Sequence, residues 1–453
     1  MHPLETHQNR SKITRTALNF PVLLLLVLIQ SCMNSLETKT DPTEELGDGT
    51  IENPFRISQY DDLLMMKDEV FLDKHFIQVN DIDASKSKEF GGFIPIGTLE
   101  APFTGSYDGN GYQITDLAYN DFGKFMGLFG YVKQAEIQNV TMVSTLHDQT
   151  QEMGMVYSNL NDQPPSDPFI PDIDSENFRT GGTLVGFNDG GVIHNCQSFS
   201  RIASRRHFLG GLVGYNAGEV SYSFANGDVA GLNYNGGLVG INSGLIQHSH
   251  ATGDLVSLGM VGGLTGYNFG GQIINSFAKG NVGSASTNGG LAAVNTGLIQ
   301  ASYATGNTNT SVGKSGSLVG RNDGEIRDSY SLGSVSRAEP IYGAGSLAGV
   351  NLVNGVIINS FAVGHVSSRI QTDEYKMGGI TGKNKGTITS SYWDTQSTGQ
   401  ATGVGEGNPE GATGLTTQQM SGPAAEINMP EFDWHTIWRT TAGYPVLRWQ
   451  EDE

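Results

Sequence analysis

The chain has 453 residues, with 46 acidic and 26 basic side chains and a formal net charge of −20 at pH 7. Nucleic-acid-binding proteins carry a basic surface, so this balance argues against a nucleic-acid partner. It also argues against attachment to anionic lipid through charge, and an acidic surface keeps a secreted protein soluble.

The first 31 residues have the organisation of a secretory signal peptide. Basic residues precede an apolar run at 17–29, and this run is too short for a comfortable membrane span. The run ends in Leu-Ile-Gln-Ser-Cys at 28–32, which resembles a bacterial lipobox. The resemblance implies that Cys32 becomes the lipidated N-terminal residue, and the alternative is an ordinary signal with a chance cysteine. Residues 32–50 are acidic and polar, which is typical of a flexible tether.

Residues 51–178 are interpreted as an N-terminal cap followed by two degenerate coils at 103–117 and 127–143. Within the cap we expect a short helix in Ile57–Met66 and a strand at Phe76–Val79, because a solenoid must cover its open end. Residues 144–178 contain four prolines and many acids. A connection of this length is more often functional or disordered than a simple link.

Between residues 179 and 394 one pattern recurs eight times, at spacings of 26 to 33 residues, and such a period is typical of a solenoid. The first glycines of the copies are Gly181, Gly210, Gly236, Gly262, Gly289, Gly316, Gly345 and Gly378. The segments between glycines are short and rich in Val, Ile, Tyr and Phe, which favours strands over helices. We therefore predict an all-β fold, a single-stranded right-handed parallel β-helix (solenoid) of about ten coils. Propeller blades are the alternative, but their repeats are longer, roughly 40–50 residues.

One column of the repeat is asparagine without exception. Its members are Asn188, Asn216, Asn242, Asn268, Asn295, Asn322, Asn351 and Asn384. Identical residues of stacked coils lie about 4.8 Å apart. Asparagine tolerates a left-handed corner, and its amides can hydrogen-bond from coil to coil, so we expect a structural Asn ladder.

A second column is mostly aromatic. Its members are Gln197, Phe224, His250, Phe277, Tyr303, Tyr330, Phe361 and Tyr392. We favour stacking within the core. The alternative is an outward-facing ladder suited to sugar rings, since the preceding small residues and these rings alternate along a strand.

The copy at 210–220, Gly-Gly-Leu-Val-Gly-Tyr-Asn-Ala-Gly-Glu-Val, resembles the GLUG motif of bacterial surface proteins. These include adhesin-like proteins and some IgA-specific metallopeptidases. The resemblance covers about 181–394 and implies a structural coil unit rather than an active site. Residues 395–453 are interpreted as a C-terminal cap whose apolar segments, 432–438 and 443–447, pack on the last coil.

Motifs for catalysis are missing from the sequence. There is no His-Glu-x-x-His, Gly-x-Ser-x-Gly elbow or phosphate-binding glycine loop. Asp228 and Asp254 share one column and would lie about 5 Å apart, close enough for a retaining pair or Ca²⁺. Each follows a glycine, however, and aspartate is a common turn residue.

The remaining candidate groups also have simpler interpretations. The carboxylates Asp81, Asp83 and Asp108 are expected to stabilise turns. Cys196 stands in a serine column and is expected to be a small packed residue. A basic cluster of Arg201, Arg205, Arg206 and His207 could meet an acidic glycan, although a solvated loop is the favoured interpretation.

These features predict a secreted, lipid-anchored protein of the bacterial cell envelope, at the outer membrane or cell surface. We expect an adhesin-like monomer that binds a glycan or protein partner through its β-helix, without catalytic activity, metal or cofactor. The alternatives are a polysaccharide lyase or glycosidase with a groove under 144–178, and a purely structural envelope protein.

Overall fold

The computed structural model describes residues 46–120, 123–144, 171–175, 178–284, 286–337, 342–369 and 376–452. Contacts divide the chain into Met1–Leu46 and Gly47–Glu453. The second unit holds every described residue except Leu46. The predicted signal peptide, Cys32 and most of the 144–178 loop lie outside the described residues.

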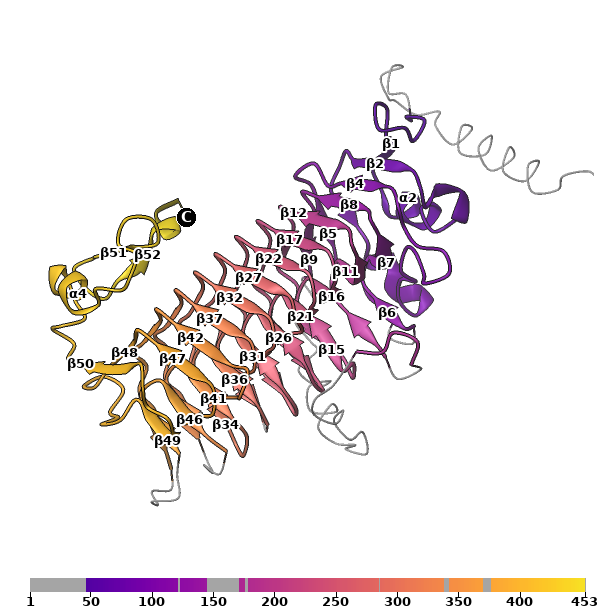
Figure 1. The fold of residues 1–453 in the computed structure, drawn as a ribbon. Coiled ribbons are helices and arrows are strands. Elements are labelled where there is room, and N and C mark those ends of the chain that lie inside the picture. The colour runs from indigo at the N-terminus through magenta and orange to yellow at the C-terminus, as the bar shows by residue number, and fades with distance from the viewer. Residues whose placement is uncertain are drawn as a thin grey trace, which may run out of the picture. The chain divides into compact units, whose positions relative to one another are not determined.

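The second unit is an all-β parallel solenoid of about 11 turns, which confirms the predicted fold class (Figure 1). A regular coil contributes five short strands, each pairing in parallel with its counterparts in the coils before and after it. One such coil runs through β20 (Asn235–Gly236), β21 (Val239–Asn242), β22 (Leu245–Gln247), β23 (His250–Ala251) and β24 (Leu255–Ser257). The stacked strands form five sheets.

The Ile sheet has 12 strands, and the middle residue of each regular strand points into the interior. Ile193, Ile246 and Ile299 are fully buried there. The strands are β1 (Phe55–Ile57), β2 (His75–Gln78), β4 (Ser106–Asp108), β8 (Glu136–Gln138), β12 (Val192–His194), β17 (Glu219–Ser221), β22, β27 (Gln272–Ile274), β32 (Leu298–Gln300), β37 (Glu325–Arg327), β42 (Val356–Ile358) and β47 (Thr387–Thr389).

The Asn sheet has 10 strands, and in the eight repeats its strand ends at, or next to, the conserved column of asparagines. The strands are β7 (Phe129–Lys133), β11 (Val185–Asp189), β16 (Val213–Asn216), β21, β26 (Thr265–Asn268), β31 (Ala292–Asn295), β36 (Val319–Asn322), β41 (Ala348–Asn351), β46 (Thr381–Asn384) and β49 (Val404–Gly407).

The aromatic sheet has 12 strands, and in most repeats it carries an aromatic residue followed by a small one. The strands are β3 (Ile82–Asp83), β5 (Gln113–Thr115), β9 (Thr141–Val143), β13 (Gln197–Ser198), β18 (Phe224–Ala225), β23, β28 (Phe277–Ala278), β33 (Tyr303–Ala304), β38 (Tyr330–Ser331), β43 (Phe361–Ala362), β48 (Ser391–Asp394) and β50 (Ala412–Leu415).

Two smaller sheets complete each coil. The Gly sheet consists of β6 (Phe125–Met126), β10 (Thr180–Gly181), β15 (Phe208–Gly210), β20, β25 (Val261–Gly262), β30 (Asn288–Gly289), β35 (Ser315–Gly316), β40 (Ala344–Gly345) and β45 (Met377–Gly378). The fifth sheet consists of β14 (Ile202–Ala203), β19 (Val229–Gly231), β24, β29 (Val282–Ser284), β34 (Thr308–Thr310), β39 (Val335–Arg337) and β44 (Val366–Ser368).

The paired glycines of each repeat mark a place where the coil is pinched. A Cβ atom on Gly236 would lie 2.0 Å from the carbonyl oxygen of Val239. On Gly237 it would lie 2.2 Å from the Gly263 oxygen and 2.7 Å from the Cβ of Ala251. The Gly-Gly pair and the facing alanine column are therefore required together. A Cβ atom on either glycine would collide with backbone, and backbone cannot move aside as a flexible side chain can.

The two ends of the solenoid are closed differently. At the N-terminal end, α2 (Tyr60–Met65) places Tyr60 and Leu63 in the core, and the 3₁₀ segments Glu69–Phe71 and Ser85–Phe90 follow. The predicted helix and the predicted strand near Phe76 are both present, with slightly different bounds.

At the C-terminal end, Trp393 replaces the usual alanine and plugs the interior. Three glycines make room for its ring: a Cβ on Gly379, Gly403 or Gly414 would lie 2.0, 2.6 or 2.7 Å from it. The solenoid continues past residue 394, because β49 pairs with β46 and β50 pairs with β48. Only the part after Leu415 leaves the coil, as α4 (Pro423–Asn428), the hairpin β51 (Trp438–Arg439) and β52 (Val446–Leu447), and the 3₁₀ turn Arg448–Asp452.

Candidate functional site

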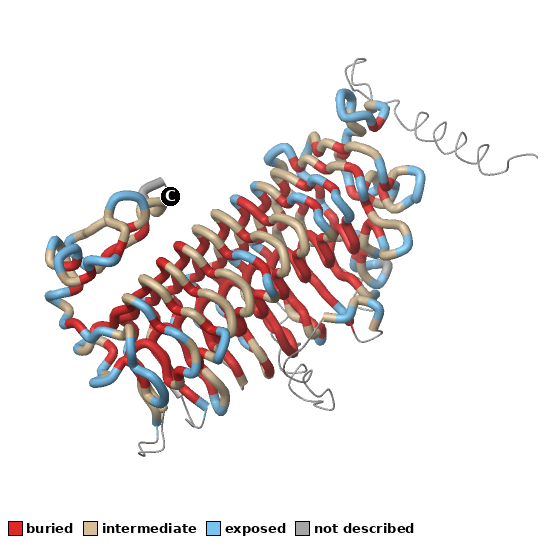
Figure 2. The backbone as a smooth tube through the Cα atoms, viewed as in Figure 1, coloured by how far each residue is buried: buried red, intermediate tan, exposed pale blue. Residues whose placement is uncertain are grey.

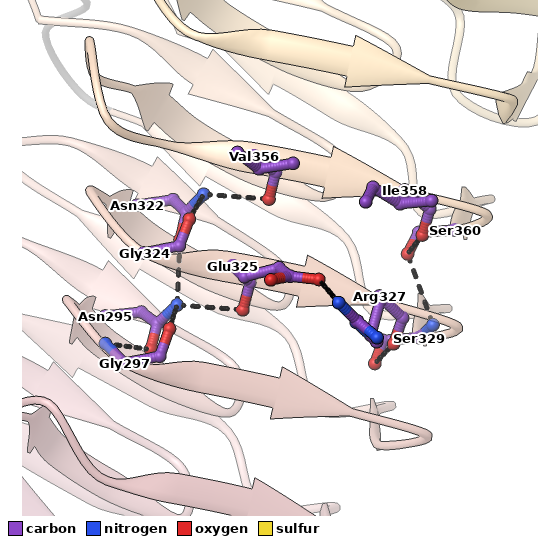
Figure 3. A network of polar contacts seen from close by, with 10 residues as sticks. All are labelled: Asn295, Gly297, Asn322, Gly324, Glu325, Arg327, Ser329, Val356, Ile358 and Ser360. Atoms are coloured by element: carbon purple, nitrogen blue, oxygen red, sulfur yellow. Dashed lines mark hydrogen bonds and ion pairs between the residues drawn. The ribbon is translucent and has the colours of Figure 1, made fainter.

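The predicted Asn residues lie in one continuous row of side-chain amides. Each Nδ2 donates to the Oδ1 of the next asparagine at 2.8–2.9 Å, from Asn188 through to Asn384. Asn384 closes the row by donating to the carbonyl of Asn408 at 2.7 Å. Each amide of the row also bonds to backbone of its own or a neighbouring turn, as Figure 3 shows for Asn295 and Asn322. The row is buried, so it stabilises the stacking of the coils and offers no ligand site.

The serine column shapes the corner between the Ile sheet and the aromatic sheet. Each Oγ donates to the carbonyl two residues earlier, and it accepts the backbone N–H of the preceding coil at 3.0–3.3 Å (Figure 3). The residue before each serine has a left-handed backbone; Tyr222, for example, has φ 49°. Cys196 takes the serine position, and burial raises the pKa of its thiol to about 12, which disfavours the reactive thiolate.

The candidate carboxylates accept hydrogen bonds from backbone N–H groups, and those of Asp228 and Asp254 join neighbouring coils. Asp228 Oδ1 accepts the N–H of Asp254 at 3.0 Å, and Asp254 Oδ1 accepts the N–H of Asn281 at 2.7 Å. Asp81, Asp83 and Asp108 likewise accept backbone N–H groups of nearby turns. Among the residues that the structure describes, no group of three or more His, Cys, Asp or Glu side chains could hold a metal ion.

The basic cluster does not form one patch. Arg201 pairs with Asp228 at 2.9 Å, whereas Arg206 is buried and donates to the carbonyls of Gly123, Lys124 and Thr180. His207 Nδ1 lies 3.0 Å from the amide nitrogen of Asn233. The three side chains thus have separate structural surroundings, and an acidic glycan would not meet them together.

The described end of the long loop packs on the solenoid. Phe178 contacts Phe187, Phe208 and Tyr215 on the outside of the Asn and Gly sheets. Ile173 packs against the same cluster. The groove predicted under 144–178 depends on residues that are outside the described ranges, so it stays a prediction.

The aromatic column forms a ladder on the outer face of the aromatic sheet. Its rings are parallel within 9° and their centroids are 4.5–5.0 Å apart from Phe224 to Phe361. The alternating alanines belong to the interior core, whereas the rings from Phe277 onward belong to a separate cluster. Our favoured interpretation, stacking within the core, is confirmed for the rings from Phe277 to Tyr392, which are buried in that second cluster. The cluster lies outside the coil, however, because successive side chains of a strand face opposite sides and the interior side is taken by alanine.

The larger part of this ladder is covered by the segment 416–452, which we call the tail (Figure 1). Trp438 lies 5.5 Å from Phe361, and Trp449 lies 5.9 Å from Tyr303, between ring centroids. The rings from Phe277 to Tyr392 are consequently buried. The apolar segments expected to close the last coil instead lie along the side of the stack, since Trp393 already fills its end.

Polar contacts fix the tail to the same face. Asp394, itself buried, accepts hydrogen bonds from Tyr444 at 2.7 Å and Thr417 at 2.6 Å. The Trp449 indole donates to the carbonyl of Ala301 at 2.8 Å. The tail is therefore bound by both ring contacts and directional bonds.

Among the described residues, nothing covers the first rungs of the ladder apart from the contact between Trp449 and His248. Tyr222 and Phe199 are 54% and 43% exposed, and Phe224, His248 and His250 are half-buried. Figure 2 shows buried, intermediate and exposed residues together along the coils of the stack. We call these five residues the open rungs. Tyr222 stacks on His248 at 4.9 Å in a second short ladder beside Phe224 and His250.

Sequence reasoning found two of the open rungs, Phe224 and His250, but missed Phe199, Tyr222 and His248. Tyr222 and His248 stand at a corner column that elsewhere contains Asn, Asp, Ala or Ser. Two large rings at such a corner are unusual, and this is the signal that could have revealed them.

Electrostatics at the open rungs are modest. Burial, and secondarily the charge of Lys279, lower the pKa of His250 to about 4, so its imidazole is neutral at pH 7. The Lys279 ammonium lies 4.4 Å from the centre of the Phe277 ring, a cation–π contact. The surface is thus an aromatic platform, with a positive charge where the open and covered rungs meet.

Comparisons with known proteins agree with this architecture. The family model described as the GLUG motif matches residues 257–283. The chain is therefore a β-solenoid that carries a GLUG motif at residues 257–283. No helix in the described part of the chain is long and apolar enough to cross a membrane.

Two relatives match part of this chain. Halomucin of Haloquadratum walsbyi is 38% identical over 96 residues, which is 20% of this chain and 1% of halomucin. A protein of Evansella cellulosilytica, named as a Gly-rich membrane protein, is 37% identical over 89 residues, which is 19% of this chain and 10% of that protein. The chain therefore spans only a small part of the length of either relative.

A crystal structure described as an immunoglobulin A1 protease from Bacteroides ovatus is 16% identical, with coverage of 89% of this chain and 94% of that one. Its TM-score is 0.34. At that score the match adds nothing to the fold assignment, which rests on the strand pairing.

Proposed function

We propose that this chain is a lipid-anchored, adhesin-like binding protein of the bacterial cell envelope, with no catalytic activity of its own. Its ligand, a glycan or a protein, would bind at the open rungs. The observation that carries the proposal is that Tyr222 and Phe199 are exposed, and Phe224, His248 and His250 half-buried, on a ladder whose other aromatic rings are buried. Exposed aromatic clusters on soluble domains commonly mark interaction sites.

Three further features support the proposal. The carboxylates of Asp228 and Asp254 accept backbone hydrogen bonds from the next coil, which favours binding over hydrolysis. One relative is named for the membrane and another as a mucin, which agrees with a location at the envelope. The lipobox-like segment ending at Cys32 would supply the anchor.

The binding proposal is tested by applying the full chain and its soluble 33–453 fragment to glycan and matrix-protein arrays. We expect saturable binding of at least one ligand that Tyr222→Ala weakens and that leaves the ligand intact in mass spectrometry. Tyr342→Ala is the matched control, because Tyr342 is 49% exposed away from the open rungs. Shortened or unsaturated glycan products would replace the proposal with a polysaccharide-active enzyme.

The anchor is tested separately. Metabolic labelling with a radioactive fatty acid should mark the wild-type chain in a bacterial host and should not mark Cys32→Ser. Labelling of that variant would contradict the lipid anchor and leave the binding proposal intact.

A further inference from the structure

We propose that the open rungs bind a tryptophan-bearing polypeptide segment of a partner protein, much as the tail binds the covered rungs. This inference rests on the proposed binding function and names its class of ligand. It is carried by the orientation of the rings, by the continuity of the ladder and by a set of backbone carbonyls.

The inner rings of the open rungs, Phe224 and His250, have their faces covered and are left with their edges for a ligand. Phe224 and His250 stack at 4.9 Å, and His250 and Phe277 at 4.5 Å, so the faces of the inner rings are covered by their neighbours. At the outer end Phe199 meets Phe224 at 86°. A sugar ring stacks on an aromatic face, whereas the positive edges of aromatic rings favour the negative face of another ring.

The covered rungs show that this surface accepts the aromatic rings of a polypeptide. Trp449 lies at 80° to His248, 25° to Phe277 and 32° to Tyr303, and Trp438 lies at 51° to Phe361. Because Trp449 contacts both Phe277 and His248, the tail reaches as far as the edge of the open rungs. The two parts form one surface, and aromatic side chains of a polypeptide occupy the described part of it that is covered.

Backbone carbonyls at the corner column add a reason to expect tryptophan. Ala301, with φ 46°, accepts the indole N–H of Trp449 through its carbonyl. Tyr222 and His248 stand at the same corner with φ of 49° and 47°, and their N–H groups bond to the next coil in the same way as that of Ala301. Within the described ranges no group donates a hydrogen bond to either of their carbonyls. An indole N–H would satisfy each of them, as it does at Ala301.

The tail itself is committed elsewhere. Next to Trp449, Gln450 bonds to the hydroxyl of Tyr330, further along the covered rungs. Trp449 is already paired with Ala301. The described segments of this chain therefore leave the open rungs to a segment of another protein, for which indole and other rings are the recognition elements.

The test uses the full chain in mild detergent and a defined probe, a synthetic peptide copying residues 430–452. Binding is followed by isothermal titration for the wild type, Tyr222→Ala, Phe199→Ala and the control Tyr342→Ala. A second peptide carries alanine in place of its three tryptophans. Neutral and acidic oligosaccharides are titrated in parallel.

We expect the peptide to bind the wild type and the Tyr342→Ala control equally. Tyr222→Ala and Phe199→Ala should each weaken binding by about tenfold, the size expected for one lost aromatic contact, and the alanine peptide should not bind measurably. Circular dichroism melting must be unchanged in both variants, since both residues are largely exposed.

Two results would overturn the inference. If the peptide does not bind, or binds equally to all four proteins, the open rungs do not recognise tryptophan-bearing segments. If an oligosaccharide binds instead and Tyr222→Ala weakens it, the ligand is a glycan, and the proposed binding function survives without this inference. If no arrayed glycan or protein responds to Tyr222→Ala either, the proposed function fails as well.

Discussion

The covered and open rungs of the aromatic ladder share one geometry and differ in their surroundings. Both have parallel rings at the same spacing, and both lie beside a left-handed corner. The covered rungs are Phe or Tyr with small or polar corner residues, and the tail buries them. The open rungs include two histidines and a corner tyrosine, and solvent reaches them. The repeat therefore forms a continuous aromatic surface, and the tail determines which part of that surface stays open to a ligand.

Removing the Trp438 side chain, the central aromatic contact of the tail, should expose the covered rungs to solvent as the open rungs are exposed. Trp438 is fully buried and stacks on Phe432 at 4.7 Å, so Trp438→Ala should destabilise tail docking by about 3–5 kcal/mol. The backbone of the tail should then gain hydrogen exchange and chymotrypsin cleavage while the coils stay folded, because the amides of Tyr330 and Phe361 remain bonded to the preceding coil. Trp434→Ala, at a half-buried ring, should do much less. Unchanged protection of the tail would show that its docking does not depend on Trp438.

A coil change at the boundary should disturb both regions together. A Cβ on Gly263 would lie 2.0 Å from the Gly290 oxygen and 2.9 Å from the Cβ of Ala278, next to the first covered rung. Gly263→Ala should therefore cost about 1–3 kcal/mol, measured by urea denaturation. Gly283→Ala is the matched control, because its new Cβ meets nothing closer than 3.8 Å. Equal stability of the two variants would show that the paired glycines are not required for the close packing of the coil.

Strong acid should weaken the docking of the tail on the covered rungs. Burial acts to raise the pKa of Asp394, but hydrogen bonds from Thr417, Tyr444 and two backbone N–H groups outweigh it, and the pKa is lowered below 3.8. The carboxylate's contribution is therefore present above pH 3.8 and is lost as pH falls through the lowered value. Tryptophan fluorescence should report tail release there. Asp394→Asn should dock more weakly at pH 7 and show a smaller acid transition.

Milder acid should lower the stability only at the open rungs, and this is the smallest of the expected effects. The pKa of His250 is lowered to about 4, so between its ordinary 6.5 and about 4 the unfolded chain takes up a proton that the folded one does not. Stability is complete above pH 6.5 and declines as pH falls towards 4. The melting temperature should drop from pH 7 to pH 5, and His250→Phe, which restores the common residue of the column, should reduce the drop. An equal drop in both proteins would assign it to another group.

Much of this molecule could be predicted from the sequence, because each column of the repeat occupies the same structural environment in neighbouring coils. The unbroken asparagines, the paired glycines and the alternation of aromatic with small residues all follow from strands stacked at one spacing. They were sufficient to predict a parallel β-solenoid and the hydrogen-bonded row of asparagine amides. The left-handed corner lies not at these asparagines, where we expected it, but at the residue before each serine, and Asp228 and Asp254 bond to the backbone of the next coil. Tertiary structure alone decided the rest. Periodicity shows that Phe277 and Tyr330 share a face but not which side of the coil it is, and the tail's docking depends on contacts such as that between Trp449 and Ala301, 148 residues apart. The open rungs exist because that non-repetitive segment covers only part of a repetitive surface.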